Sequence, residues 1–144
     1  MSQTVQDALK HATLYSDDYM YRFVKLPPNA ITAAASVVAQ AGNPFTALLV
    51  DKDEVTLMIE DEDLEQYQRH MIDHTVSDVK YRLITFDIEL DSSLVGFMAV
   101  VSTKLAEAGI SIMPFAAFSR DHIFVPEGDY DKAIATLNDL KNEQ

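Results

Sequence analysis

The order of sequence patterns between Tyr81 and Leu140 constrains the fold of this 144-residue chain more than any other feature. From Tyr81 to Glu89 apolar and polar side chains alternate, which is typical of a strand with one buried face. Asp91-Ser92-Ser93 follows with residue types that cap helices, and from Leu94 apolar residues recur at helical spacing. Gly109 then stands where a left-handed helix end is expected. These patterns predict a strand followed by a helix.

The remainder of this stretch adds two strands and a second helix. An apolar run from Ile110 to Phe118 and another from His122 to Val125 are separated by the polar turn Ser119-Arg120-Asp121. Asp129 then opens a last helix with one apolar stripe. Pro114, within the first run, indicates an edge strand or a bulge. The order strand, helix, strand, strand, helix predicts helices on one face of an antiparallel sheet, an α+β, ferredoxin-like fold.

The first half of the chain is expected to repeat this order of elements. Its predicted elements are a leading helix (Val5–Leu14), a strand (Tyr19–Leu26), a helix (Ala30–Ala41), a hairpin (Phe45–Val50 and Val55–Ile59) and a helix that begins at Asp61-Glu62-Asp63. The turn residues Asn43-Pro44 separate the helix Ala30–Ala41 from the hairpin. We therefore predict two units, residues 1–77 with the leading helix and residues 78–144.

Composition limits the classes of partner. Apolar residues make up 48% of the chain, which is enough for a sizeable core. The net charge of −12 argues against nucleic acid and anionic membranes, because both require a positive surface. The absence of cysteine excludes disulfides and thiolate chemistry. Residues 1–10 lack the pattern of a signal peptide, and no apolar run reaches the ~18 residues of a membrane helix. We therefore expect a soluble, cytoplasmic protein.

Three short segments resemble the ACT domain, a small regulatory module that binds amino acids. They are Leu94-Val95-Gly96, which is similar to the family's ligand loop, Leu105–Ile112, which is similar to its helix-to-strand passage, and Asp121–Pro126, which is similar to its third strand. The second half as a whole resembles small bacterial proteins that carry two ACT-like units and no catalytic domain. This resemblance implies an amino-acid-like ligand, no cofactor, and a homodimer or higher homo-oligomer.

The resemblance also implies a fourth strand in each unit, which neither half shows after its second helix. Each sheet is completed by a strand from the other half, or the two sheets join edge to edge into a longer one. Both solutions cover strand edges that would otherwise pair with other chains.

The turn from strand to helix at Asp91–Gly96 is the best site candidate. A helix N-terminus offers unpaired N–H groups to a carboxylate, and a glycine there permits close approach. We expect Asp91 to meet a ligand ammonium and the strand Ile112–Phe115 to form the other wall. The candidate ligand-binding residues are Asp91, Ser92, Leu94, Val95, Gly96, Ile112, Pro114 and Phe115. Ordinary helix capping by Asp91-Ser92-Ser93 is the structural alternative. The counterpart loop of the first half, Pro28-Asn29-Ala30, lacks a matching glycine, which makes a second site there less favoured.

Three other polar clusters admit functional interpretations. His70 and His74, with Asp73 between them, share a helical spacing used by zinc ligands, but a polar helix end explains them more simply. The acidic cluster at residues 51–54 lacks the spacing of a calcium loop and is interpreted as a solvated hairpin turn. Arg120-Asp121-His122 admits acid/base chemistry, although a charged hairpin turn is the simpler explanation. We therefore predict no metal site and no catalytic residues.

Three functional hypotheses follow from these observations. The first is a non-enzymatic regulatory protein that binds an amino acid or a similar zwitterion. The alternative is an ACT-like assembly module without a ligand. The third is a small enzyme, which has only Arg120, Asp121 and His122 in its favour.

Overall fold

The computed structural model describes residues 2–42 and 45–144, so the predicted turn at Asn43-Pro44 lies outside the described residues. The chain forms two compact units. The central unit comprises Tyr19–Tyr81, and the C-terminal unit combines Met1–Asp18 with Arg82–Gln144. These bounds differ from the expected division into 1–77 and 78–144, because the N-terminal segment (residues 2–18) packs into the C-terminal unit.

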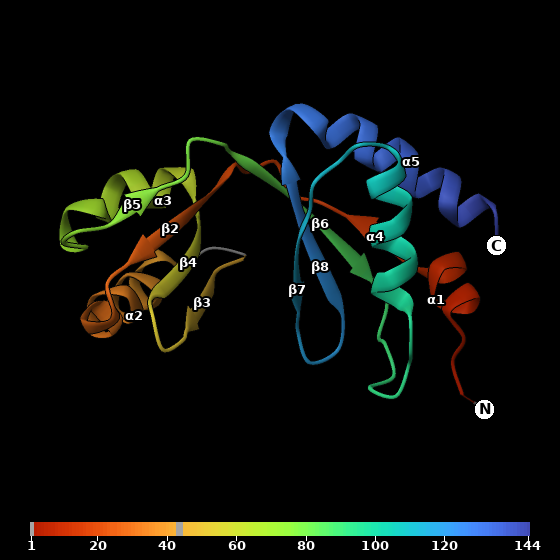
Figure 1. Ribbon diagram of the computed structural model, residues 1–144, viewed down its shortest axis with the longest axis horizontal. Helices are drawn as coiled ribbons and strands as arrows, with labels where there is room; N and C mark the ends of the chain where they lie inside the picture. The colour runs from red at the N-terminus through yellow and green to blue at the C-terminus, as the bar shows by residue number, and fades with distance from the viewer. Residues whose placement is uncertain (1, 43–44) are drawn as a thin grey trace. The chain divides into compact units, whose positions relative to one another are not determined.

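The central unit has a four-stranded antiparallel sheet with helices on one face (Figure 1). Its elements are β2 (Tyr21–Leu26), the 3-10 turn η1 (Pro28–Ala30), α2 (Ile31–Ala41), β3 (Ala47–Val50), β4 (Val55–Glu60), α3 (Asp61–Tyr67), the 3-10 turn η2 (Gln68–His70) and β5 (Thr75–Val76). The sheet order is β3-β4-β2-β5. Alternate residues of β2 and β4, among them Val24 and Leu57, are buried beneath the helices. The predicted order of elements is confirmed.

The fourth strand of the central unit is β5, which the sequence did not reveal. Thr75 and Val76 pair antiparallel with Lys25 and Val24 of β2. A run of two residues is too short to show an alternating pattern, so this strand had no detectable signal. The helix before it begins as predicted, and Glu60 caps it by accepting from Asp63 N–H at 3.0 Å.

The C-terminal unit has the same architecture (Figure 1). Its elements are α1 (Val5–His11), β1 (Thr13–Tyr15), β6 (Tyr81–Asp87), α4 (Phe97–Glu107), β7 (Met113–Ala116), β8 (Asp121–Pro126), the 3-10 turn η3 (Glu127–Asp129) and α5 (Tyr130–Asn142). The strands follow the order β1-β6-β8-β7, so Pro114 lies in an edge strand. This was one of the two predictions made for it. The ferredoxin-like α+β fold is confirmed.

The N-terminal segment supplies the fourth strand of this unit. β1 pairs antiparallel with the end of β6, with Leu14 opposite Phe86. The prediction that a strand from the other half completes a sheet is therefore confirmed for this unit. The predicted leading helix is shorter than expected, because it ends at His11 and Leu14 belongs to β1.

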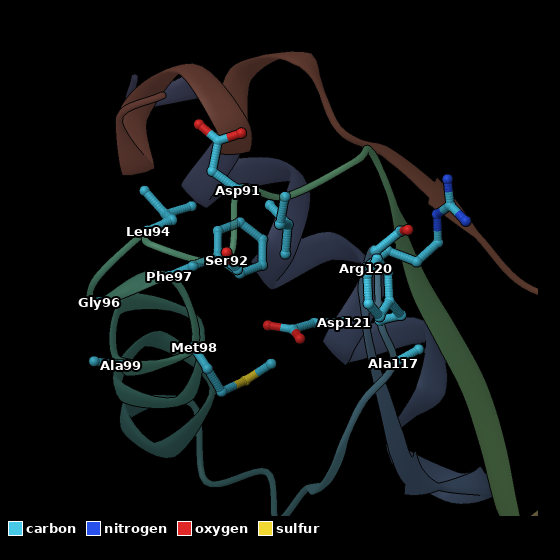
Figure 2. A pocket seen from close by; sticks show the side chains of 13 residues that line it. Asp91, Ser92, Leu94, Gly96, Phe97, Met98, Ala99, Ala117, Arg120 and Asp121 are labelled. Atoms are coloured by element: carbon cyan, nitrogen blue, oxygen red, sulfur yellow. The ribbon is translucent and has the colours of Figure 1, made fainter. Parts of the chain in front are cut away.

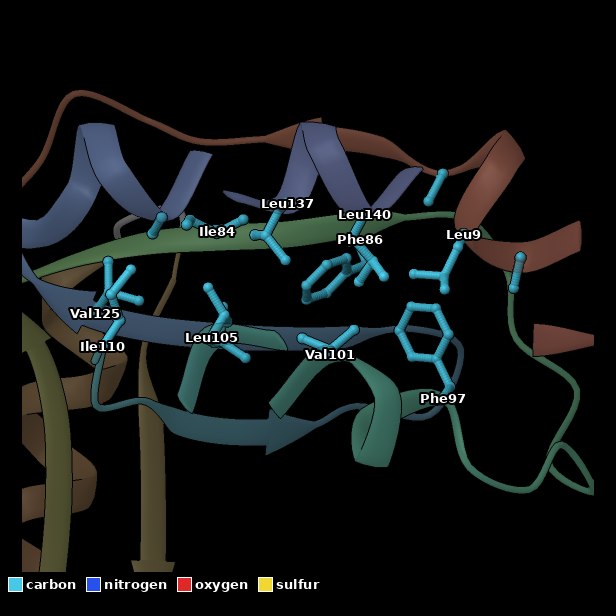
Figure 3. Packing of buried hydrophobic residues seen from close by; sticks show 14 residues of the cluster. Leu9, Ile84, Phe86, Phe97, Val101, Leu105, Ile110, Val125, Leu137 and Leu140 are labelled. Carbon is cyan, nitrogen blue, oxygen red and sulfur yellow. The ribbon is translucent and has the colours of Figure 1, made fainter. Parts of the chain in front are cut away.

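The core of the C-terminal unit unites α1, α4 and α5 with one face of the sheet (Figure 3). Leu9 of α1 is buried beside Phe97 of α4 and Leu140 of α5. Phe86 meets Phe97 edge to face, with ring centroids 5.4 Å apart. This packing fixes the first turn of α4 against both the sheet and the N-terminal segment.

The start of α4 differs from the prediction. The helix begins at Phe97 rather than Leu94, and its N-cap is Gly96 with a φ of 93° and no side-chain cap. Asp91-Ser92-Ser93 therefore does not cap it, because Leu94 N–H closes a separate turn onto Asp91 O at 3.0 Å. The helix end matches the prediction: Gly109 is left-handed with a φ of 76°, and Ile110 N–H returns to Leu105 O at 3.0 Å.

No helix within residues 2–42 and 45–144 is long and apolar enough to span a membrane.

Candidate functional site

A cavity of about 370 Å³ lies in the C-terminal unit, between the first turn of α4 and the turn that joins β7 to β8 (Figure 2). Its lining residues are Leu90, Asp91, Ser92, Leu94, Gly96, Phe97, Met98, Ala99, Ala117, Phe118, Ser119, Arg120 and Asp121. The two walls are joined at their base, where Leu90 N–H donates to Ser119 O at 2.7 Å. The predicted helix N-terminus therefore does face a hollow.

The first wall consists of the cavity loop (residues 89–96) and the start of α4. Gly96 adopts a left-handed conformation that turns the chain into the helix. The helical hydrogen bonds begin with Val100 N–H, which donates to Gly96 O at 3.1 Å. The amides of Phe97, Met98 and Ala99 precede that bond, so they are the donors that a helix N-terminus presents to an anion.

The second wall is the hairpin turn 117–121, which is closed by Ala117 N–H donating to Arg120 O at 3.0 Å. Asp121 opens β8 on the same face as Ile123, which is buried in the core beneath the helices. In Figure 2 the Asp121 carboxylate points into the space between the hairpin and α4. Its partial burial raises the pKa of the Asp121 carboxyl, and the charge of His122 opposes that shift.

Asp91, the predicted partner of a ligand ammonium, is turned toward the N-terminal segment. Its carboxylate accepts from Gln3 N–H at 3.2 Å, and its own N–H donates to Gln3 Oε1 at 3.0 Å. Figure 2 shows this carboxylate directed away from Asp121. The cavity thus has two carboxylates in its lining, and Asp121 is the one that faces α4.

The predicted residues divide between the cavity and other parts of the unit. Asp91, Ser92, Leu94 and Gly96 line the cavity. Val95 is 87% exposed beside it and is not part of the lining.

The expected second wall also lies elsewhere. Ile112, Pro114 and Phe115 do not line this cavity, and Phe115 instead packs edge to face on Phe124 of β8. The wall is formed a few residues later, by the turn 117–121. The strand order could have indicated this wall. Because β6 and β8 are antiparallel neighbours, the end of β6 lies beside the start of β8. The loops at residues 89–96 and 117–121 must therefore meet.

The Arg120-Asp121-His122 cluster is divided by the strand. Asp121 faces the helices, whereas His122 points to the opposite face, where its Nδ1 lies 2.7 Å from Thr85 Oγ1. Arg120 forms an ion pair with Asp87, at 3.4 Å between Nε and Oδ1. Burial and the charge of Arg120 lower the pKa of His122. These side chains are not arranged to act together on one reacting group.

The histidine pair at residues 70 and 74 does not share a helix face. α3 ends at Tyr67, His70 lies in η2, and His74 Nδ1 is 2.6 Å from Met71 O. Across residues 2–42 and 45–144, no three His, Cys, Asp or Glu side chains gather in a way that would hold a metal ion.

Two features of the central unit have local structural roles. Asp51 Oδ1 accepts from the N–H groups of Asp53 and Glu54 at 2.8 and 2.9 Å, and these bonds lower the pKa of Asp51. The acidic cluster at residues 51–54 is therefore a hairpin turn that the Asp51 side chain stabilises. The counterpart loop before α2 forms η1, in which Ala30 N–H donates to Pro27 O at 3.0 Å.

Comparison with protein families identifies the second half of the chain. Residues 76–139 match the model of the ACT domain. The resemblance seen in the sequence is thereby confirmed. None of the curated proteins matches the chain.

Solved structures share the fold over nearly the whole chain. A Vibrio cholerae protein of unknown function, described as a possible transport protein, is 27% identical, with a TM-score of 0.72 and 92% of each chain covered. The regulatory subunit of aspartate kinase from Thermus thermophilus is 15% identical, with a TM-score of 0.62, covering 90% of this chain and 98% of that one.

An aspartate kinase from Clostridium acetobutylicum, described as an allosteric enzyme, is also 15% identical, with a TM-score of 0.68. The match covers 91% of this chain but 34% of that enzyme. Similarity at this level of identity establishes a common fold.

Proposed function

We propose, from the match of residues 76–139 to the ACT-domain model, that this chain is a regulatory protein, without catalytic activity, that binds a free amino acid. The observation that carries the proposal is the cavity of the C-terminal unit, where the first turn of α4 lies across from the Asp121 carboxylate. A zwitterion presents both charges that such a cavity would pair.

The ligand's α-carboxylate would accept from the amides of Phe97, Met98 and Ala99, where the helix dipole adds partial positive charge. Its ammonium would pair with Asp121, in place of the Asp91 expected from the sequence. The volume of about 370 Å³ lies within the ~300–1,000 Å³ of small-molecule sites. Leu94, Phe97, Met98 and Phe118 supply apolar surface, which favours a ligand with an uncharged side chain.

The regulatory role is supported by the kinds of protein that share the fold. They include a regulatory subunit of aspartate kinase and an aspartate kinase described as allosteric. We propose that this protein likewise responds to its ligand, through a change in its association with a second copy or another protein. Val95 lies beside the cavity and the fully exposed Phe118 is part of its lining, and both offer apolar surface for a homodimer contact.

An assembly module without a ligand is the second candidate. The same exposed Val95 and Phe118 are compatible with it, because they would offer apolar surface to a partner whether or not a ligand binds.

Thermal unfolding in the presence of single free amino acids distinguishes the two candidates. A ligand at 100 times its dissociation constant adds about 2.7 kcal/mol to the unfolding free energy, which raises Tm by several degrees. We expect one or a few amino acids with uncharged side chains to do so. Equal Tm values with all amino acids, together with concentration-dependent self-association, would support the assembly module instead.

A further inference from the structure

We propose that Gln3 is a positioning residue for the cavity loop. The N-terminal segment would then help to set the shape of the ligand cavity. The proposal rests on the proposed function in one respect, since the loop it positions forms one wall of the ligand cavity. The N-terminal segment is remote in sequence, 86 to 88 residues from its partners in the loop.

Gln3 holds the cavity loop with three hydrogen bonds. Its Nε2 donates to Glu89 O at 3.1 Å, and its Oε1 accepts from Asp91 N–H at 3.0 Å. Its backbone N–H donates to Asp91 Oδ2 at 3.2 Å. The side-chain amide thus uses its donor and its acceptor on backbone groups two residues apart, as a neighbouring strand would.

The part of the loop that Gln3 holds is the beginning of the first cavity wall. Asp91 begins the turn that Leu94 N–H closes at 3.0 Å, and Gly96 then turns the chain into α4. A separate bond, from Leu90 N–H to Ser119 O at 2.7 Å, ties the loop to the opposite wall. Displacement of Asp91 would therefore move the entry to α4 and alter the width of the cavity.

Gln3 is itself fixed by the elements that follow it. Thr4 caps α1, with its Oγ1 accepting from Asp7 N–H at 3.1 Å. Leu9 and Ala12 are buried in the core that also contains Phe97, the first residue of α4. The three hydrogen bonds of Gln3 therefore position the cavity loop relative to the first turn of α4, which lines the cavity. By linkage, ligand binding and docking of residues 2–4 should favour one another.

The test compares Gln3→Ala and Gln3→Glu with Gln6→Ala, a matched control. Gln6 is exposed on α1, so its truncation should leave the loop unchanged. Hydrogen exchange at the amides of residues 89–96 is measured on the full chain without ligand. We expect about three- to tenfold faster exchange in Gln3→Ala. The change should be larger in Gln3→Glu, whose carboxylate cannot donate to Glu89 O and repels Asp91.

The double variant Gln3→Glu/Asp91→Asn should restore part of the protection, because it removes the charge repulsion. Equal exchange in Gln3→Ala and Gln6→Ala would overturn the proposal, whatever the wild-type protein binds. Where an amino acid binds the wild type, several-fold weaker affinity in Gln3→Ala alone supports the link to the cavity, and unchanged affinity contradicts that link. Lack of any amino-acid ligand would refute the proposed function, while the exchange rates would still decide whether Gln3 holds the loop.

Discussion

Asp121 has two properties of a carboxylate that would gain from a cationic ligand. It lies in the lining of the cavity, opposite α4, and its environment raises its pKa, because burial disfavours the charged form. An ammonium group in the cavity would restore a favourable partner for that charge. A partly buried charge of this kind lowers the stability of the free protein, and a cationic ligand would stabilise the complex by pairing with it. Such residues are frequent at functional sites.

The pH dependence of stability tests this account of Asp121. Since its folded pKa lies above the ordinary value of 3.8, the folded state binds the proton more tightly than the unfolded state. Ionised Asp121 therefore lowers stability above its folded pKa, and this cost disappears as pH falls below 3.8. We predict that Asp121→Asn raises the unfolding free energy at pH 7, and that the gain shrinks toward pH 3.5 in urea titrations. An equal effect at both pH values would mean that burial of the charge is not the cause.

Gly96 is the second residue with a specific requirement. Its φ of 93° is rarely adopted by L-residues, although a Cβ there would meet nothing within 4 Å. We predict that Gly96→Ala costs about 1–2 kcal/mol of unfolding free energy through backbone strain alone. Gly128→Ala is the matched control, because Gly128 has open space and no positive φ. Similar stabilities of the two variants in chemical denaturation would refute the strain argument.

Among the elements, α1 and β1 are the ones whose role the sequence did not disclose. A prediction made along the chain groups neighbours in sequence, so the leading helix was assigned to the first half. In the folded protein β1 instead completes the sheet beside β6, and α1 fills the core above it. The apolar stripe of α1 indicated that the helix packs against something, but a stripe does not identify its partner.

Leu9 tests whether α1 belongs to the C-terminal unit. The side chain is 1% exposed, so Leu9→Ala should cost about 2–5 kcal/mol. We expect the substitution to accelerate hydrogen exchange in α4 and α5 more than in β3 and β4. Leu49→Ala, at a side chain that is 56% exposed, should alter stability by less than ~0.5 kcal/mol. A larger acceleration of exchange in β3 and β4 would contradict the assignment of α1 to the C-terminal unit.

The start of α4 shows where local sequence signals are insufficient. Asp91-Ser92-Ser93 has the composition of a cap, yet Asp91 forms its bonds with Gln3, 88 residues away. The glycine rather than the capping residues marks the helix start. Sequence spacing thus located the loop to within a few residues, but the hydrogen-bond partners of its side chains depended on a distant segment.

For the whole molecule, the sequence predicted the fold well because both units repeat the same order of apolar patterns. The ferredoxin-like architecture followed from that order, and the ACT-domain resemblance is confirmed over residues 76–139. The candidate site was predicted in part. Its first wall could be read from a strand, a loop and a glycine that are contiguous in sequence. Its second wall required knowledge of which strands are neighbours, and the composition of the hairpin turn indicates only a polar surface.

The two units differ in how they complete their sheets. The central unit closes its sheet with β5, which follows α3 directly along the chain. The C-terminal unit takes its fourth strand from residues before β2, so its cavity loop is held by the beginning of the chain. Gly96, with its left-handed conformation before α4, and the cavity between the helix start and the hairpin turn belong to this C-terminal unit.

Calorimetric titration of the intact protein with free amino acids tests the central claim most directly. The account predicts that at least one amino acid binds, that Asp121→Asn weakens its affinity about ten- to hundredfold, and that Asp91→Asn has little effect. Asp91→Asn is the matched control, because it removes the other carboxylate of the lining while keeping an oxygen that accepts from Gln3. Binding that Asp121→Asn leaves unchanged, or no binding by any amino acid, would contradict the account.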